Sequence, residues 1–447
     1  MSTTRLGAAN TPRVHVRTAG WGLTVAFVLI GLAMAVPAVT GWEVHVRWFP
    51  PLHADWRPRL GPGTWPALAV GALGVWQAVP LARRLPWRRL LLVAWLAGVA
   101  WMLALAFVDG TSGVGRILDY GYEYLNTARA TTDFHATLLE YVERIPNTRP
   151  DHWPVHIAGH PPGALLFFVG LVRLGVGSGF AAGLVVTLIA ATTPLAVMVV
   201  ARTLGAEDQG RAALPFLVFG PAAIWQSVSA DAMFAAVAAW GMAALAVGAT
   251  RRSVGWSLVA GLLLGYCVML SYGLPLLGIL AVAVLLAART WFPLPFAAAA
   301  ALGVVLAFVP FGFVWWEALP VLQDRYWAGV AGRRPTGYWL WGNLAALLFC
   351  AGPLLGAALA SSGRSMAVAV RRPSRQVLGA LSLAGVAMVV AADLSLMSKA
   401  EVERIWLPFV PWLMLSCSFL PPRWIRPGLA LQVAFALVVQ HLLWSDW

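Results

Sequence analysis

One polar stretch interrupts a sequence that is otherwise mostly apolar, and its carboxylates could do acid–base chemistry. The stretch runs from Val108 to Gly163 and contains Asp119 and Glu123, with Tyr122 between them. A carboxylate at a membrane boundary is partly desolvated, which raises its basicity, so either acid could act as a general base. The same acids could instead solvate a helix end beside interfacial tyrosines. Because long charged loops between apolar segments are usually functional, the pattern predicts a catalytic loop.

Histidines near the end of this stretch could bind an anion or a metal. His160 precedes a Pro-Pro dipeptide, which fixes the start of the following helix and leaves its first amides free for an anion such as phosphate. The alternative is a rigid helix start with an interfacial histidine. His152, His156 and His160 are four positions apart, a spacing that suits metal ligands on a helix. Pro154 and Gly159 interrupt any such helix, so we expect no metal site there.

Charges are also crowded in residues 398–406, just before an apolar run. The only lysine of the chain, Lys399, stands there with Glu403 and Arg404. Charges at the start of a lipid-facing helix are costly unless they are used, so we expect them to be functional. Arg404 could form a structural ion pair with Glu403, or its planar fork could hold the phosphate of a ligand.

Aromatic and acidic residues supply further candidates for ligand binding. A later polar loop mixes arginines with aromatic residues, among them Tyr326, Arg333, Tyr338 and Trp341. Aromatic rings can stack on sugar faces, and guanidinium groups pair with phosphate oxygens. An interfacial aromatic belt explains the same residues equally well. Asp231 opens an apolar run, where an acid typically caps a helix.

Composition defines the class of protein. Hydrophobic residues make up 60% of the chain and charged residues 11%, and the mean hydropathy is +0.76. Apolar runs of about 20 residues recur, so we predict an all-α, polytopic transmembrane protein. The net charge of +13 comes from arginines scattered between apolar runs, a pattern typical of orientation signals rather than of a nucleic-acid-binding face. Three cysteines within apolar runs indicate neither a disulfide framework nor a metal site.

The alternation of apolar runs and arginine clusters predicts about thirteen spans. If all clusters lie in the cytoplasm, one short run after the polar loop must fail to cross the membrane. Ala164–Val176 and Leu214–Trp225 are the candidates, and we favour the first as a short, partly inserted helix because about 13 residues are too few to span. The predicted organisation is a cytoplasmic tail (1–19), two additional spans (20–89), a catalytic core (90–420) with an outer loop (109–163), and a C-terminal span (421–447).

This topology assigns the polar residues to two faces. Asp119, Arg333 and Arg404 should lie on the outer face, with the polar loop. Arg252 and Arg372 should lie on the cytoplasmic face. The expected location is therefore the plasma membrane, with the active site on its extracytoplasmic side.

Four short motifs follow one another along the chain. They are a membrane-edge acid followed by Tyr122, Tyr124 and Ala128, the HPPG sequence that ends the polar loop, SADAMF at the start of a later span, and SKAEVERIWLPFVPW. In this order they resemble the GT-C superfamily of membrane glycosyltransferases, most closely its protein O-mannosyltransferase and aminoarabinose transferase branch. The last motif is similar to a segment of members from high-GC bacteria. The resemblance covers roughly residues 90–420.

The resemblance implies a sugar donor linked to a polyprenyl phosphate and an acceptor hydroxyl of a glycan or glycolipid on the outer face. It also implies inversion at the anomeric carbon, with a loop acid as the base. Matched by position, Asp119 corresponds to the loop acid and His160 to the residue before Pro-Pro. The frequent Asp-Glu pair is absent, because Tyr120 follows Asp119, and this leaves Glu123 as a rival base.

The resemblance further implies roles for the other polar residues. The residues expected to hold the donor phosphate are His160, Lys399, Arg333 and Arg404. Those expected to contact the sugar or the acceptor are Tyr122, Asp231, Tyr326, Tyr338, Trp341 and Glu403. Neither a cofactor nor a metal is required, since a lipid phosphate whose charge is neutralised is a competent leaving group.

Two other function classes stay open on the sequence alone. A lipid-linked polysaccharide polymerase or ligase would share the arginine-rich outer loops but depend on arginine and histidine rather than on a loop acid. A transporter would place charges inside its spans, often with internal repeats. Asp393 is the one acid within a late apolar run.

Overall fold

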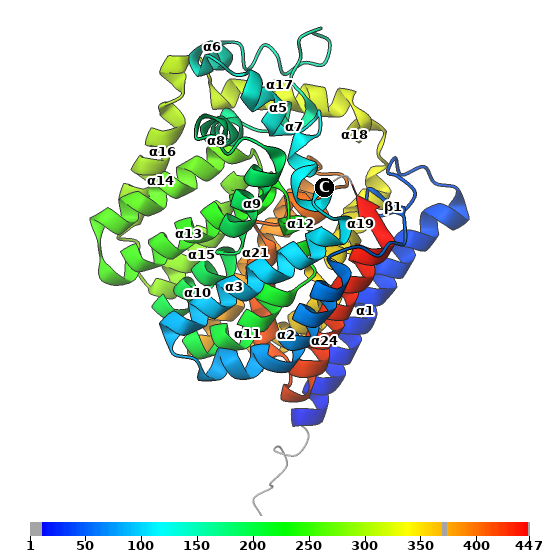
Figure 1. The fold of residues 1–447 in the computed structure, drawn as a ribbon. Coiled ribbons are helices and arrows are strands. Elements are labelled where there is room, and N and C mark those ends of the chain that lie inside the picture. Colours follow the sequence, from blue (N-terminus) through cyan, green and yellow to red (C-terminus); the bar gives the residue numbers. More distant parts are fainter. Residues whose placement is uncertain (1–10, 369–372, 446–447) are drawn as a thin grey trace, which may run out of the picture.

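Long helices form the body of the protein (Figure 1). The computed structural model describes residues 11–368 and 373–445. Within these ranges, eight helical segments are long and apolar enough to cross a membrane, which confirms the prediction of a polytopic helical protein. They are α1 (Thr11–Thr40), α2 (Thr64–Arg84), α3 (Trp87–Ala106) with η1 (Phe107–Asp109), α9 and α10 (Gly179–Ala190 and Thr193–Thr203), α13 (Ala230–Arg251), α16 (Leu294–Leu306) with η4 (Val309–Phe311), α21 (Pro373–Leu394) and α24 (Pro422–Leu442).

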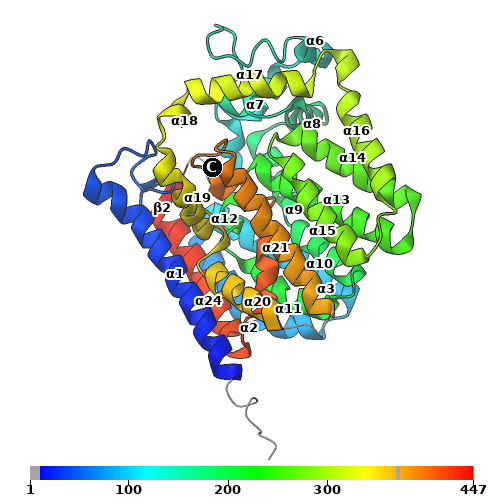
Figure 2. The same cartoon turned by 180° about the vertical axis from the view of Figure 1, so that it is seen from behind.

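Several of these helices carry large apolar side chains on their outer surface. Trp21 and Val25 of α1 and Leu302 of α16 are more than half exposed. Exposing such apolar surfaces to water would be unfavourable, whereas in a membrane they are the surfaces expected to contact lipid. Along one edge of the molecule α1 packs beside α20 (Leu354–Val368) and α19 (Thr336–Ala351) (Figure 2).

A sharp bend divides one apolar segment into α19 and α20, whose axes differ by 100°. Gly352 lies at the break with φ +82, a left-handed conformation that favours glycine, and a proline follows it. The break leaves backbone groups unpaired in an apolar setting, which is costly. Gln432 of α24 compensates: its Nε2 donates to the Ala351 carbonyl (2.6 Å) and its Oε1 accepts from the Leu354 amide (3.4 Å).

Other apolar helices are shorter than a full span. They are α8 (Pro162–Arg173), α14 (Val254–Leu270), η3 with α15 (Leu274–Leu276 and Leu277–Ala288), and α23 with η5 (Val410–Met414 and Leu415–Phe419). The second candidate for a run that does not cross, Leu214–Trp225, is divided between α11 (Glu207–Phe219) and α12 (Ala223–Gln226). The number of about thirteen spans inferred from the sequence counts several of these short helices as spans, so it stays a prediction. The partial insertion of α8 also stays a prediction.

Short helices cover one end of the helical body, the end that we call the loop face (Figure 1). They come from the polar stretch, from residues 315–333 and from residues 402–405. The predicted loop at residues 317–337 is largely helical. The elements are α4 (Ser112–Gly115), η2 (Ile117–Asp119), α5 (Tyr124–Ala130), α6 (Phe134–Leu139), α7 (Val155–Ala158), α17 (Trp315–Ala328), α18 (Val330–Arg333) and α22 (Val402–Ile405).

The direction of α13 relates the loop face to the opposite end of the molecule. Its first turn contains Asp231, which contacts Arg404 of α22 at the loop face. The helix then runs 22 residues to Arg251, about 33 Å at 1.5 Å per residue and close to the thickness of a bilayer core. Arg252 therefore lies about one helix length from Asp231 and Arg404, whereas Arg372 is outside the described residues.

A two-stranded antiparallel ribbon joins distant parts of the chain, a feature that the all-α expectation did not include. Strand β1 (Ala54–Trp56) pairs with β2 (Leu443–Ser445), with Ala54 opposite Ser445. Three-residue strands are too short to show an alternating pattern in the sequence. Their pairing depends on α2 and α24 lying side by side, which brings residues 54–56 and 443–445 together.

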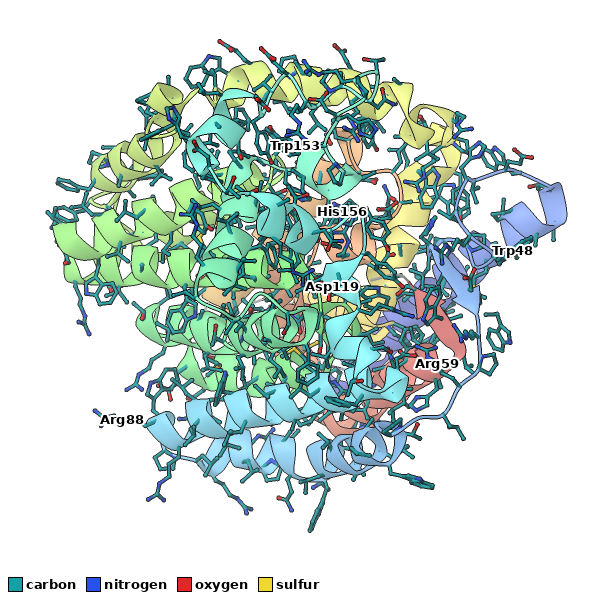
Figure 3. All side chains as sticks on the ribbon, turned by 45° about the horizontal axis from the view of Figure 1, so that its top comes forward. Trp48, Arg59, Arg88, Asp119, Trp153 and His156 are labelled. Atoms are coloured by element: carbon teal, nitrogen blue, oxygen red, sulfur yellow. The ribbon has the colours of Figure 1, made fainter. Side chains whose placement is uncertain are left out.

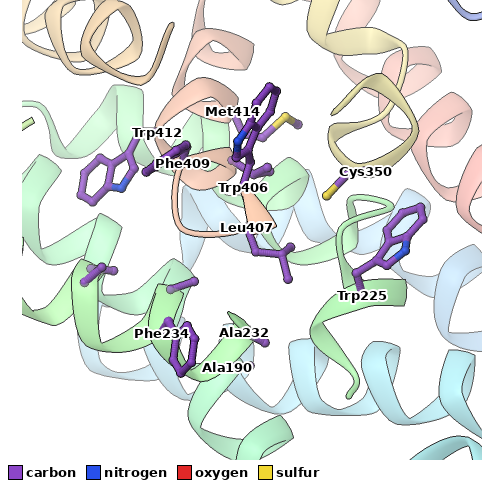
Figure 4. Packing of buried hydrophobic residues seen from close by; sticks show 14 of the residues in the cluster. Ala190, Trp225, Ala232, Phe234, Cys350, Trp406, Leu407, Phe409, Trp412 and Met414 are labelled. Carbon is purple, nitrogen blue, oxygen red and sulfur yellow. The ribbon is translucent and has the colours of Figure 1, made fainter. Parts of the chain in front are cut away.

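Aromatic side chains fill the core beneath the loop face (Figure 4). Trp406 and Trp412 are 1% exposed or less, and they pack in the same cluster as Phe234 and Trp225. Their burial fixes the short helix α22, which directly precedes Trp406. The charged residues of α22 are thus held on a rigid apolar base.

Candidate active site

Four charged or titratable side chains form a buried chain beneath the loop face. Glu123 Oε1 lies 2.8 Å from His156 Nδ1, and His156 Nε2 lies 3.3 Å from Arg404 Nη2. Arg404 Nη1 pairs in turn with Asp231 Oδ2 at 2.6 Å. All four residues are 6% exposed or less. We call this set the buried charge chain; His156 lies near the centre of the loop face in Figure 3.

Short structural elements bring these four residues together from distant parts of the sequence. Glu123 is the residue before α5, and its amide donates to the Tyr120 carbonyl in a turn. Pro154 precedes α7 and sets the start of the helix that carries His156. Arg404 lies in α22, which follows a left-handed residue, and Asp231 lies in the first turn of α13. The chain thus fastens the polar loop to two helices of the core.

Electrostatic interactions favour the charged forms of Glu123 and Arg404. Burial raises the pKa of Glu123, but His156 and the nearby Arg404 lower it by more, so this pKa lies below the usual value. Burial alone would lower the pKa of Arg404, and the carboxylates of Asp231, Glu123 and Glu401 raise it above the usual value. A buried, paired carboxylate with a lowered pKa is a weak base, which disfavours Glu123 as the proton acceptor.

Asp119, the other predicted base, lies outside this chain. It is part of an ion pair with Arg129, whose Nη2 is 2.5 Å from Asp119 Oδ1, and its side chain is 39% exposed. Arg129 also donates to the Gly177 carbonyl, which ties the loop to the start of α9. Gly179 is required there, because a Cβ at that position would meet Asp119 Oδ2 at 2.1 Å. Asp119 and Glu123 therefore have separate surroundings.

His160 packs against the buried charge chain without joining it. Its Nδ1 lies 2.7 Å from the His156 carbonyl oxygen and 2.8 Å from the Tyr124 hydroxyl. Burial lowers the pKa of His160, although the nearby Asp231 opposes this shift. A neutral imidazole held by a carbonyl and a phenol positions the loop rather than carrying a charge for a phosphate.

A pocket opens beside the buried charge chain, between the polar loop, α12, α22 and the β ribbon. The volume inside it that water-sized groups can occupy is about 40 Å³, and the total rises to about 610 Å³ when the open space at its mouth is included. The polar side chains that line it include Arg59, Asp109, Arg116, Glu403 and Gln440. Because Glu403 lines the pocket and the adjacent Arg404 joins the charge chain, α22 connects the two.

Two of the arginines in this pocket differ in their surroundings. Arg59 pairs with Asp109 through two contacts, at 2.5 and 2.9 Å, and Gln440 also donates to Asp109. Arg116 has no ion pair with any described carboxylate. Its guanidinium lies over the rings of Tyr120 and Trp444, at 5.4 and 5.1 Å from their centroids. Cation–π contacts thus hold Arg116 in place while its fork stays available to an anion.

Lys399 is bound to the protein through backbone carbonyls. Its Nζ donates to the Arg334 carbonyl (3.0 Å) and lies 4.6 Å from the Trp327 ring centroid. Burial lowers its pKa. Arg334 is itself buried and pairs with Glu401, whereas the predicted phosphate ligand Arg333 is exposed. The sequence offered two adjacent arginines, and only the surrounding helices distinguish them.

The four aromatic residues that were predicted to contact the sugar or the acceptor lie in two different regions, near the buried charge chain and on α19. Tyr122 packs edge-on against His156, and the Tyr326 hydroxyl accepts from the Lys399 amide (2.8 Å). Tyr338 is fully buried, and its hydroxyl donates to the Ala33 carbonyl of α1. Trp341 bonds to the carbonyl one turn before it on α19 and packs on Tyr338. Tyr338 therefore joins α19 to α1, and neither aromatic residue lines the pocket.

The sequence did not assign four residues of this region to the site. Arg59, Asp109 and Arg116 line the pocket, and His156 is the centre of the charge chain, although its spacing had suggested only a metal ligand. Asp109 directly follows the apolar run of α3, and an acid at that position could have been recognised in the sequence as a candidate site residue. Within residues 11–368 and 373–445, no group of three or more His, Cys, Asp or Glu side chains is placed to hold a metal ion.

No protein-family model matches the chain, and no curated protein matches it. Among solved structures, ArnT from Cupriavidus metallidurans in the apo state is similar over 64% of this chain and 54% of its own, with 15% identity and a TM-score of 0.41. The Archaeoglobus fulgidus oligosaccharyltransferase complex with Zn and sulfate is similar over 77% of this chain and 51% of its own, with 12% identity and a TM-score of 0.45. The matches thus span about half of each of those chains. Similarities this distant establish neither the family nor the function of the protein.

Proposed function

We propose that the protein is a membrane glycosyltransferase that moves a sugar from a polyprenyl phosphate to an acceptor hydroxyl at the loop face. The main support is the pocket described above, which combines the guanidinium of Arg116 with the carboxylate of Glu403. The guanidinium can bind a phosphate, and the carboxylate can accept the proton of a hydroxyl group. The resemblance of the sequence motifs to the GT-C superfamily agrees with this reading, as does the helical membrane fold.

Arg116 is the favoured phosphate ligand in this proposal. Of the predicted ligands, Arg404 pairs with Asp231 and Lys399 donates to carbonyls, so both are engaged within the protein. Arg333 is exposed. Arg116 alone combines a place in the pocket with no ion pair to a described carboxylate. Its planar fork can contact two phosphate oxygens together.

Glu403 is the favoured base, ahead of the two loop acids, because its carboxylate lines the pocket. Asp109 also lines the pocket, where two contacts with Arg59 and a hydrogen bond from Gln440 fix it to the wall. Glu123 is buried in the charge chain, and Asp119 pairs with Arg129 outside the pocket. Glu403 would take the proton of the acceptor hydroxyl as that oxygen attacks the anomeric carbon. The bond from this carbon to the phosphate oxygen breaks, and the lipid phosphate leaves with the electron pair and is stabilised by Arg116.

Replacing Arg116 with alanine is expected to weaken binding of the donor. The loss should be about 1.5–3 kcal/mol, roughly 10- to 150-fold in Kd, the range for hydrogen bonds to charged groups. Arg116→Lys should recover only part of it, because lysine cannot pair bidentately. Binding of a fluorescent polyprenyl phosphate measures the change. The control is Arg149→Ala, which removes an exposed loop arginine paired with Asp151 and should bind normally.

A donor panel tests the proposed function directly. The full chain in lipid nanodiscs is incubated with polyprenyl-phosphate hexoses and pentoses carrying a radiolabel, and with glycan or glycolipid acceptors. Transfer from a monophosphate donor supports the proposal. Transfer only from a polyprenyl diphosphate would instead favour the polymerase or ligase class. Uptake of a solute into vesicles without any transfer would indicate a transporter.

A further inference from the structure

A groove between α2 and α24 lies at the end of the molecule opposite the loop face. Four arginines line it: Arg83 and Arg84 at the end of α2, and Arg423 and Arg426 at the start of α24. The remaining lining residues are apolar, and the groove has about 960 Å³ of space, counted to its open mouth. Both helices are long and apolar enough to cross a membrane, so the groove lies where their ends meet the membrane surface.

The arginines of this groove have no acidic partner among residues 11–368 and 373–445. All four are exposed, and none forms an ion pair with a described carboxylate; Arg426 donates only to the Trp76 carbonyl, at 3.1 Å. An acid near this end, Glu207, is already paired with Arg202 and Arg211, and it does not line the groove.

The helix dipoles divide the four arginines into two pairs. Arg83 and Arg84 complement the negative end of α2. Arg423 and Arg426 occupy the first turns of α24, where the positive end of the dipole makes cations unfavourable. Four like charges converging on one groove, two of them at the unfavourable helix end, are an arrangement that an anion would stabilise.

We propose that this groove binds the headgroup of a membrane lipid that carries two phosphates, such as cardiolipin. Each phosphate can pair with two guanidinium groups, so two phosphates match four arginines. Apolar lining residues such as Val79 and Ile425 suit the glycerol and the first acyl carbons. The occupant belongs to the leaflet on the side opposite the loop face. The site is thus distinct from the pocket at which transfer is proposed, and it does not depend on that function.

The test uses the purified full chain in neutral detergent, with bound lipid counted by native mass spectrometry. Cardiolipin is expected to bind with one high-affinity molecule per chain and to raise the Tm. In the Arg423→Gln/Arg426→Gln variant its affinity should fall at least tenfold. The matched control is Arg251→Gln/Arg252→Gln, which removes two arginines from the end of α13 and should bind cardiolipin normally.

Each competing result has a clear meaning. Equal loss of affinity in both variants would show unspecific attraction to a basic surface and overturn the proposal. Equal affinity for phosphatidylglycerol and cardiolipin would overturn the match to two phosphates. Strong competition by soluble pyrophosphate would show an anion site that needs no lipid, which also contradicts the proposal. If the first variant is poorly folded without lipid, Arg83→Gln/Arg84→Gln gives the same readout from the other wall of the groove.

Discussion

Replacing Glu403 with glutamine is expected to reduce sugar transfer by about two to four orders of magnitude, the usual contribution of a positioned base. The substitution keeps the size of the side chain but removes its ability to accept a proton. Donor binding should change little, because the proposed phosphate ligand is Arg116 on another wall of the pocket. Steady-state rates with the best donor from the panel, together with donor Kd values, measure both effects.

The two loop acids provide the comparison for this result. Glu123→Gln alters the buried charge chain, so it should lower stability more than it lowers the rate per folded molecule. Asp119→Asn removes an exposed partner of Arg129 and should retain most of the activity if Glu403 is the base. Loss of transfer in Asp119→Asn, with normal folding and an active Glu403→Gln, would return the role of base to the loop acid.

Replacing Asp231 with asparagine is expected to destabilise the protein by about 3–5 kcal/mol. Both members of the Asp231–Arg404 pair are 3% exposed or less, so the change leaves a guanidinium buried without its closest counter-charge. Breaking a buried ion pair by removing one partner typically has this effect, because the remaining charge cannot be solvated. Denaturant-induced unfolding in detergent, followed by tryptophan fluorescence, measures the change.

The matched control is Asp151→Asn, which removes the partner of Arg149 in an exposed pair of the polar stretch. Exposed pairs contribute about 0–1 kcal/mol, so this variant should unfold like the parent protein. Arg404→Lys separates the two roles considered for that arginine. Large destabilisation with unchanged donor affinity supports the structural pair with Asp231. Weakened donor binding with normal stability would place the donor phosphate at Arg404.

The architecture was predictable where it depends on local composition. Apolar runs of sufficient length identify a helical membrane protein, because lipid leaves the backbone few alternatives to helices. The end of α2 was readable from Arg83 and Arg84, and the start of α3 from the proline that precedes it. The β ribbon and the bend between α19 and α20 were not, since they depend on contacts with α24 across the fold.

The site was predictable as a set of residues but not as an arrangement. The sequence identified Glu123, Asp231, Glu403 and Arg404, because charges beside apolar runs are conspicuous. It proposed Glu403 as one possible partner of Arg404, but it did not connect Arg404 with Asp231, which lies 173 positions away and contacts it in the structure. No local spacing encodes a contact across that separation. For the same reason the aromatic support of Arg116 by Trp444 could not be foreseen.

The β ribbon also sets the order in which the protein can be assembled during its biosynthesis. Arg59 is translated early, yet its Nη1 donates to the carbonyl of Leu443, which follows 384 residues later. Since the chain enters the membrane from its N-terminal side, all the spans from α1 to α24 are synthesised before that bond can form. The pocket therefore lacks one wall, including the Trp444 ring, until α24 is in place. A nascent chain in which the polar loop has already been synthesised therefore cannot complete the proposed donor site before α24 is inserted.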